Sequence, residues 1–518
     1  MEEETEYEKQ RQANIARNQA LLRQLELADL GSSLAASSPK AKKSVTSTTT
    51  ASKRSSRSST RSNAVKRVKQ EDLTPRRASA RIRGLKPEGE GEGASAAAEE
   101  AGKLAAAKAE ASRMRVPGTM KFEDMSASGL AQAWTFDDAV EEGEEEGEEG
   151  RKELAKDVVQ LRKEMSSLKV YERFAPNEIK ITPERIFYMN FHPSVSHRLV
   201  LAGDKTGNLG VWDVDHVQQT SKSEDEDNEE LVSPTLYLFK VHARTLSSLG
   251  FAPGRAHQLY TASYDGSIRS VDFKSGTSSE TYFAEGNHDA DGVCEMDFAD
   301  SNTIYYSTFG GEIGRVDVRA PGSESERFRA HEKKVGGLSL HPGAPHLCAT
   351  SSLDRTMKIW DFRKITKTDD GERQAAFVTE YGSRLSISCT SWNLAGDLVC
   401  NGYDDTINVF NLRESATWKP APSSVPELTP SSTIRHNCQS GKWVTILKAA
   451  WQANPADQVH KFVIGNMKRY MDIFNADGVQ LARLGGEDVT TVPSACKFHP
   501  QKNWVVGGTA SGKVVLFE

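Results

Sequence analysis

Short apolar runs of strand length alternate with polar turns at regular intervals along residues 175–518. The clearest unit covers residues 331–363 and contains three such runs: 335–340, 347–351 and 357–360. His341-Pro342 and Asp354-Arg355 supply the turns between them. This pattern predicts one blade of a β-propeller, because a small four-stranded sheet cannot bury its own faces and must be repeated around a ring.

The same unit occurs seven times. The first strand of each copy ends in an aromatic residue, or once in leucine, followed by a turn: Phe191, Phe251, Phe298, Leu340, Trp392, Trp451 and Phe498. About twenty residues later the third strand ends in a second shared pattern: Trp212-Asp213, Val271-Asp272, Val316-Asp317, Trp360-Asp361, Phe410-Asn411, Phe474-Asn475 and Phe517-Glu518. These paired positions predict an all-β, seven-bladed WD-repeat β-propeller over residues 175–518, preceded by a largely disordered N-terminal region with short helices.

The seventh copy stops at Phe517-Glu518, on its third strand. A sheet that lacks its outer strand leaves an edge of unpaired backbone groups. Glu178-Ile179-Lys180-Ile181, just before the first blade, alternates in the manner of a strand. We expect it to supply the missing strand, so that the two ends of the propeller are joined.

Residues 1–150 are predicted to be mostly disordered, with a short helix over 6–30. The Ser/Thr-rich segment 39–86 carries fifteen Lys and Arg and only two acidic residues, which suits nuclear import with weak nucleic-acid contact, or else a solvated linker. Residues 137–149 are acidic, and solubility, masking of the basic segment and histone contact all remain open for them. A second acidic segment, 224–230, is expected to be an exposed loop.

Residues 151–174 predict an amphipathic helix. Five apolar residues recur at intervals of three and four and form one stripe: Leu154, Val158, Leu161, Met165 and Leu168. The stripe spans barely two heptads, so we expect it to pack against the propeller rather than to form a coiled coil.

The sequence contains none of the familiar catalytic motifs, such as a phosphate-binding loop, a nucleophile elbow or His-Glu-x-x-His. The six cysteines are scattered, and neither a zinc site nor a cofactor site is expected. No apolar run is long enough to span a membrane. His331 and His341 are interpreted as structural, with Ser352, Asp354 and Trp360 as expected hydrogen-bonding partners. A binding protein, not an enzyme, is therefore predicted.

Cations collect in loops that a propeller brings to one face, namely those before each first strand and those between second and third strands. The candidate DNA-contacting residues are Arg185, Lys205, Arg244, Lys333, Lys334, Arg384, Lys442, Trp443, Lys468 and Arg469, and Arg355 lies in a similar turn. Further aromatic residues lie in the same loops: Tyr264, Phe309 and Tyr403. Acidic residues there are interpreted mostly as turn formers: Asp265, Asp289, Asp291, Asp404 and Asp405. Cations interleaved with aromatic rings on a domain that is not basic as a whole indicate contact with phosphates and stacking on bases.

Trp443 has two readings. Its indole either folds back as a cap on the sixth blade or projects from the basic loops, carried by Gly441 and flanked by Lys442. The projecting arrangement suits a damaged duplex, because a lesion weakens stacking and lowers the cost of opening a base step.

Two other functions compete with DNA binding. Asp317-x-Arg319 and Asp361-x-Arg363 on neighbouring blades are similar to elements that contact cullin-ligase adaptors, which would make the chain a substrate receptor of a ubiquitin ligase. An arginine at this position also satisfies carbonyl groups in the blade itself. The acidic runs favour a third hypothesis, a platform for histones, other chromatin proteins or peptides.

Several short segments match a known family: Ile434-Arg435-His436, residues 441–445, Ala450-Trp451, residues 465–470, Tyr7-Glu8-x-x-Arg11 and residues 76–84. In these the chain resembles the fungal DNA damage-binding WD-repeat proteins related to WD repeat protein 76. More distantly it is similar to the small subunit of the UV-damaged-DNA-binding complex. The resemblance implies a nuclear protein that binds single- or double-stranded DNA, prefers UV-damaged DNA, and acts in DNA metabolism and the DNA damage response.

In the distant relative, a loop leading into the sixth blade inserts a short aromatic-containing tripeptide into the lesion. Here a different tripeptide, Gly441-Lys442-Trp443, occupies that loop. The resemblance also places Arg185 and Lys334 where the relative touches DNA.

Overall fold

The computed structural model describes residues 116–127, 131–134, 158–220, 231–284, 291–320, 325–368, 370–420, 427–441 and 443–518. Several predictions lie outside these residues: the helix over 6–30, the basic segment 39–86, the acidic runs 137–149 and 224–230, Asp289 and Lys442.

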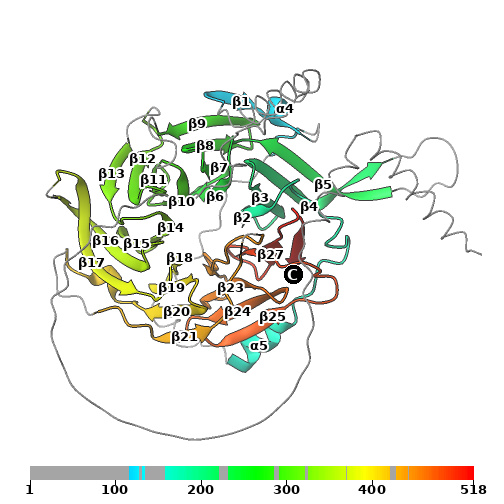
Figure 1. Cartoon of the computed structure of the whole chain (residues 1–518). Coiled ribbons are helices and arrows are strands. Elements are labelled where there is room, and N and C mark those ends of the chain that lie inside the picture. The colour runs from blue at the N-terminus through cyan, green and yellow to red at the C-terminus, as the bar shows by residue number, and fades with distance from the viewer. Residues whose placement is uncertain are drawn as a thin grey trace, which may run out of the picture. The chain divides into compact units, whose positions relative to one another are not determined.

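Seven antiparallel sheets stand around a central axis as the blades of a ring, which confirms the predicted fold (Figure 1). Blade one comprises β2 (Ile186–Phe191), β3 (Leu199–Asp204), β4 (Asn208–Thr220) and β5 (Leu231–Lys240). Blade two comprises β6 (Leu246–Ala252), β7 (Arg255–Ser263), β8 (Ser267–Asp272) and β9 (Thr277–Phe283). Blade three comprises β10 (Val293–Phe298), β11 (Thr303–Thr308), β12 (Glu312–Asp317) and β13 (Ser325–Arg329). Consecutive strands pair within each blade, so every connection inside a blade is a local one.

Blades four to seven repeat the arrangement. They comprise β14 (Val335–His341), β15 (Ala344–Ser352), β16 (Thr356–Lys367) and β17 (Arg373–Gly382); β18 (Ile387–Trp392), β19 (Asp397–Gly402), β20 (Thr406–Asn411) and β21 (Ser432–Arg435); β22 (Ala450–Trp451), β23 (Lys461–Asn466), β24 (Tyr470–Asn475) and β25 (Gln480–Leu484); and β26 (Ala495–Phe498), β27 (Val505–Gly508) and β28 (Val514–Phe517). A short 3-10 helix, η3 (Ser415–Thr417), follows β20. The first strands β2, β6, β10, β14, β18, β22 and β26 line the axis.

The core lies between the blades. One apolar cluster joins Ile186 and Trp212 of blade one to Val506 and Leu516 of blade seven, and all four side chains are at most 2 % exposed. Strands such as β3 are buried along their whole length because neighbouring sheets cover both of their faces. Each blade therefore completes the core of the next, which is the reason the unit must be repeated.

The predicted closing segment does join the two ends of the ring. Lys180 forms a β-bridge with Lys513, Val170 forms another with Phe517, and Val514 N donates to Ile179 O at 3.0 Å. The side chain of Ile179 is 1 % exposed. The contact consists of separate bridges and not of one continuous strand, and it begins at residue 169, earlier than expected.

Gly210 on β4 shows how close the closing segment lies to blade one. A Cβ atom at this position would meet Ile181 O at 2.3 Å, nearer than any side chain tolerates. Only glycine allows the two backbones to approach in this way.

The amphipathic helix is present but shorter than predicted in its described part. Helix α5 (Val158–Ser166) buries Leu161 and Met165 against blades six and seven, which confirms packing on the propeller. It ends at Ser166 and not at residue 174, because Lys169 and Tyr171 donate their backbone N–H groups to Glu518 and Leu516 at 2.9 Å. The backbone there is bound to the edge of blade seven and no longer continues a helix.

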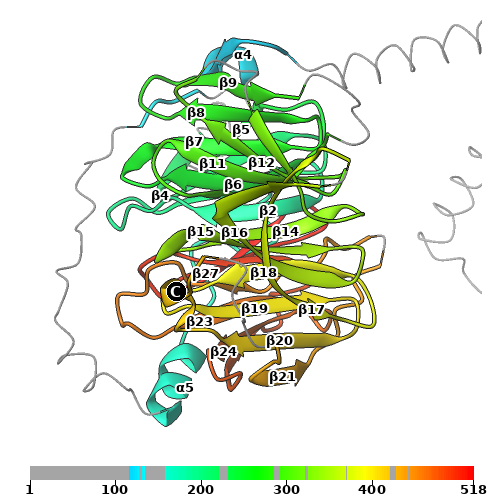
Figure 2. The ribbon, with the colours of Figure 1, turned by 90° about the vertical axis from the view of Figure 1, so that its left-hand side faces the viewer.

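A segment within residues 1–150 that the sequence pattern did not single out packs on blade two. Strand β1 (Thr119–Lys121) adds a fifth strand beside β9, and the short helix α4 (Phe122–Met125) follows it. Phe122 and Trp134 join an aromatic cluster, and buried Arg269 donates to Val116 O at 2.8 Å and Gly118 O at 2.6 Å. Figure 2 shows α4 and α5 at opposite sides of the outer rim. An isolated three-residue strand carries too little periodicity to be recognised before the blade that binds it is known.

Two histidines at the ends of first strands connect neighbouring blades in their neutral form. His192 Nε2 lies 2.9 Å from Ala256 O, and His499 Nε2 lies 3.2 Å from Ser194 O. Their Nδ1 atoms accept backbone N–H groups, from Ser194 and Lys502 respectively. Burial lowers the pKa of His192 to about 3 and that of His499 to about 4.

These shifts predict loss of stability in mild acid. The unfolded chain takes up protons at both histidines near pH 6.5, whereas the folded chain resists until lower pH. We expect the free energy of unfolding to fall by roughly 1–3 kcal/mol per histidine between about pH 6.5 and about pH 4. Denaturant titrations across that range measure it, and His499→Gln, which keeps a donor but does not titrate, should flatten the dependence. A slope identical to that of the parent chain would show that His499 does not contribute.

Candidate nucleic-acid interface

The loops predicted to share one face of the ring do lie side by side. Lys205, in the turn between β3 and β4, donates its N–H to Arg185 O at 3.0 Å, and its own carbonyl accepts the Thr245 hydroxyl at 2.8 Å. Arg244 directly precedes Thr245, so cations of blades one and two form one continuous surface. We call the ring surface made by these loops and their counterparts in the other blades the basic face.

The other blades extend the basic face in the same way. Ser352 Oγ donates to Lys333 O at 3.2 Å, and Ser383 N, next to Arg384, donates to Arg355 O at 2.9 Å. Six of the candidate side chains are exposed: Lys205, Arg244, Lys333, Arg384, Lys468 and Arg469. Arg185 and Lys334 are half-buried nearer the axis. Lys468 and Arg469 lie in the equivalent turn of blade six, between β23 and β24.

Lys334 is held on an aromatic cluster at the centre of the basic face. Its Nζ atom lies 4.4 Å from the ring centroid of Tyr264 and 4.3 Å from that of Phe309, and it donates to the Tyr264 hydroxyl at 3.1 Å. Phe187 completes the cluster, with its ring 5.4 Å from that of Tyr264. The two rings stabilise the ammonium group through cation–π contacts. Burial nevertheless lowers the pKa of Lys334 below its ordinary value.

No carboxylate among the described residues pairs with Lys334. An ammonium group fixed over aromatic rings and lacking such a counter-ion attracts an anion strongly, because it is already partly desolvated. The sequence pattern missed Phe187, which follows the buried Ile186 at the start of β2. It also missed Lys513, in the β27–β28 turn, whose Nζ donates to Asn177 Oδ1 at 3.1 Å. Lys513 could have been identified from the repeat, because it lies between the second and third strands of blade seven, as Lys205 and Lys468 do in their blades.

Trp443 projects and does not cap the blade. Its side chain is 85 % exposed, the largest value among the exposed large apolar residues of the described chain. Gly441 has a left-handed φ of 62°, and no atom lies within 4 Å of where its Cβ would be. The segment after Trp443 reaches towards the axis, where Thr445 Oγ1 donates to Ile186 O at 2.6 Å. The segment that carries Trp443 of blade six is therefore joined to the start of β2 in blade one.

Among the acidic residues of the basic face, Asp265 forms its own turn, as predicted, by accepting Ser267 N at 3.0 Å, and the others bind groups outside their turns. Asp265 accepts Ala243 N at 3.0 Å, Asp404 accepts the Ser383 hydroxyl at 2.7 Å, and Asp405 accepts Cys438 N at 3.1 Å. Asp291 forms an ion pair with Arg327 at 2.6 Å. Of these four carboxylates, Asp291 is therefore neutralised by an arginine, while the other three are held by uncharged donors.

The histidine of the fourth blade is structural. His331 Nδ1 lies 2.8 Å from Asp354, and its Nε2 lies 2.8 Å from the Thr350 hydroxyl, which also accepts Trp360 Nε1 at 2.8 Å. The prediction of Ser352 as a partner was wrong: its hydroxyl donates to Lys333 O instead. Thr350 lies within reach of the His331 imidazole, whereas Ser352 lies two residues further along β15 and reaches Lys333 instead. The register of β15 therefore decided which hydroxyl binds the histidine.

The two Asp-x-Arg elements differ from each other. Arg363 binds the buried Asp361 through two nitrogens and also donates to Trp418 O at 2.8 Å, so its guanidinium holds the blade together. Arg319 binds Asp317, but both side chains stay exposed, by 69 % and 41 %. For Arg363 the contacts favour the structural interpretation, whereas the Asp317–Arg319 pair is accessible to a partner.

Comparison with known proteins agrees with this architecture. The family model described as "WD domain, G-beta repeat" matches residues 322–361. No helix in the described part of the chain has the length and apolar character to cross a membrane.

Several curated fungal proteins are similar over nearly their whole length. The chain is 40 % identical to the DNA damage-binding protein CMR1 of Phaeosphaeria nodorum, over 99 % of this chain and 98 % of the relative. It is also 40 % identical to the proteins of that name from Emericella nidulans, over 100 % and 99 %, and from Neurospora crassa, over 99 % and 98 %. With a seven-bladed ring, a WD repeat and this extent of identity, the chain belongs to the fungal CMR1 family of WD-repeat proteins.

Proposed function

We propose that the protein binds DNA through the basic face, prefers UV-damaged duplex, and acts in the nucleus in DNA metabolism and the damage response. The names of its relatives support DNA damage as the context. The observation that carries the proposal is Lys334, an ammonium group held over Tyr264 and Phe309 on the face that also carries exposed cations such as Lys205 and Arg244. The function is one of binding and not of catalysis.

The basic face offers two kinds of contact. Exposed side chains such as Lys205 and Arg244 neutralise phosphates, which positions a duplex without reading its sequence. The exposed indole of Trp443 offers a stacking surface, which discriminates where a lesion has weakened the base stack. The same cations also accept single-stranded DNA, whose phosphates are equally charged. Lys442 and the basic segment 39–86 add further positive charge on the same chain.

Substitution of Arg185 or Lys334 tests whether the basic face binds DNA. We expect Arg185→Ala and Lys334→Ala each to weaken duplex binding with little dependence on sequence. Each lost phosphate contact should also reduce the slope of log K against log salt concentration by about 0.9. Titrations of fluorescent damaged and undamaged duplexes at several salt concentrations measure both quantities.

Lys502→Ala is the matched control, because Lys502 is an exposed lysine in the loop between β26 and β27, at the opposite end of the first strand. It should change neither affinity nor slope. If both test variants kept the parent slope, DNA would bind another surface or the segment 39–86, and the proposal for the basic face would fail.

A further inference from the structure

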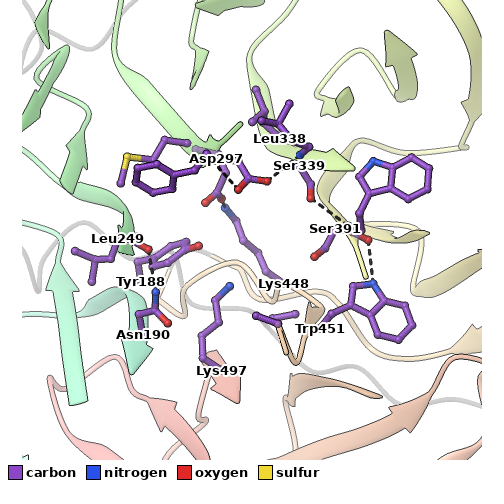
Figure 3. Close-up of a pocket in the computed structure, with 18 of the residues that line it drawn as sticks. Tyr188, Asn190, Leu249, Asp297, Leu338, Ser339, Ser391, Lys448, Trp451 and Lys497 are labelled. Carbon is purple, nitrogen blue, oxygen red and sulfur yellow. Dashed lines mark hydrogen bonds and ion pairs between the residues drawn. The ribbon is translucent and has the colours of Figure 1, made fainter. Parts of the chain in front are cut away.

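A cavity of about 670 Å³ occupies the axis of the ring and begins at Phe187, next to the aromatic cluster of the basic face. First strands of all seven blades line it, from Phe187 and Ile446 at one end to a rim of prolines at the other: Pro193, Pro253, Pro342 and Pro500. These prolines follow the first strands, so the rim belongs to the face opposite the basic face. Figure 3 shows charged side chains pointing into the cavity from several blades.

The carboxylates in the cavity are already bound. Glu295 accepts Lys448 Nζ at 2.5 Å and the Ser248 hydroxyl at 2.8 Å, one on each oxygen. Asp297 accepts Leu340 N at 2.8 Å and Phe298 N at 2.9 Å. Their acceptor capacity is therefore largely used within the protein.

Lys497 differs from its neighbours. It is largely enclosed by the ring, and its Nζ atom lies 5.1 Å from the ring centroid of Tyr188. Among the described residues it has no ion-pair or hydrogen-bonding partner, whereas Lys448, 5.9 Å from the same centroid, is paired. Burial lowers the pKa of Lys497. The ammonium group of Lys497 has no acceptor among the described residues, and an anion entering the cavity would supply one.

We propose that the axial cavity binds a carboxylate group carried on an apolar body, with Lys497 as its ion-pair partner. The walls also include Met296, Trp392 and Trp451, and Leu394 at the rim is 46 % exposed, so an apolar body attached to the anion has surfaces to contact. Two polar groups of the wall are bound within the protein: Trp451 Nε1 donates to Ser391 O at 2.9 Å, and Asn190 Nδ2 donates to Leu249 O at 3.2 Å.

The charges favour a carboxylate over a phosphate. Glu295 and Asp297 lie in the same cavity as Lys497, and like charges at short range oppose a dianion more strongly than a monoanion. The carboxylate group can belong to a small organic acid or to an acidic residue of a peptide. The proposal does not depend on DNA binding, because the rim lies on the other face.

Ligand-observed NMR on the full chain tests the site with hexanoate, hexanol, hexylamine and hexyl phosphate, each at about 10 mM. We expect hexanoate to bind and the other three to bind roughly tenfold more weakly or not at all, because only the carboxylate supplies a charge-assisted hydrogen bond without excess negative charge. A short peptide with a glutamate between leucines, compared with its glutamine counterpart, separates the two sources. Binding of the glutamate peptide as well as hexanoate identifies a peptide site, and binding of hexanoate alone identifies a site for small acids.

Lys497→Met removes the ammonium group and keeps the length of the side chain, while Lys502→Met makes the same change outside the cavity. Hexanoate affinity should fall roughly tenfold in the first variant and stay unchanged in the second. The melting temperature of Lys497→Met should barely change, because the ammonium group makes no ion pair or hydrogen bond among the described residues. Equal affinity for hexanoate and hexanol in the parent chain, or full hexanoate affinity in Lys497→Met, would overturn the proposal.

Discussion

Deleting residues 1–181 lowers the melting temperature by on the order of 10 °C or more, whereas deleting residues 1–115 leaves it almost unchanged. The longer deletion removes Ile179 and Ile181, which are buried between blades one and seven, and exposes the outer edge of β28. Deleting residues 1–135 should give an intermediate loss, because it strips Phe122 and Trp134 from blade two. Differential scanning calorimetry of the three truncations provides the comparison.

Point variants in the full chain show whether the loss of stability comes from the closing segment itself or from the loss of the other deleted residues. Ile179→Ser should destabilise the ring by about 2–4 kcal/mol, because it removes a fully buried side chain and buries a hydroxyl. Lys180→Ser is the matched control, since Lys180 is exposed on the same bridge. If the truncations ending at residues 115 and 181 unfolded at the same temperature, the segment would not contribute to ring closure.

Trp443→Ala narrows the preference for damaged over intact duplex by roughly fivefold to a hundredfold, since stacking on an aromatic side chain contributes about 1–3 kcal/mol per base. Affinity for intact DNA and the melting temperature should barely change, because the indole is exposed and supports no core. The measurement is a pair of binding curves on otherwise identical duplexes with and without a UV lesion.

Trp443→Phe serves as the control for stacking. A phenyl ring keeps an aromatic face, so this variant should retain part of the preference that alanine loses. Equal losses on both duplexes would place Trp443 among general DNA contacts, and a marked fall in melting temperature would mean that the indole is a structural residue. Either result would move the lesion-sensing position to another part of the basic face.

The strand repeat could be read from the sequence because each blade uses local rules. Every copy has an aromatic residue or leucine before a turn and Asp, Asn or Glu after the third strand, and such spacing follows from the geometry of one hairpin after another. The closing segment at Ile179 was also predictable, since the seventh copy lacked a strand and a short alternating run lay before the first. The loops that carry Lys205 and Arg244 were assigned to one face by the same repeat logic.

Other features needed the assembled ring. The segment 116–134 has no periodicity of its own, and only the edge of β9 and the buried Arg269 give it a place. The end of α5 was set by pairing of Lys169 with Glu518, a contact between residues at opposite ends of the propeller. Sequence patterns report neighbours along the chain, and neither contact is local.

The sequence by itself determined the seven-bladed fold, the basic character of one face and the family to which its motifs point. Only the tertiary structure decided that Lys334 rests on Tyr264 and Phe309, that Trp443 is exposed, and that Lys497 faces an axial cavity with no ion-pair partner among the described residues. The physical reason is that a strand pattern fixes which side of its own sheet a residue occupies. What lies across the axis from that residue depends on how seven sheets close into one ring.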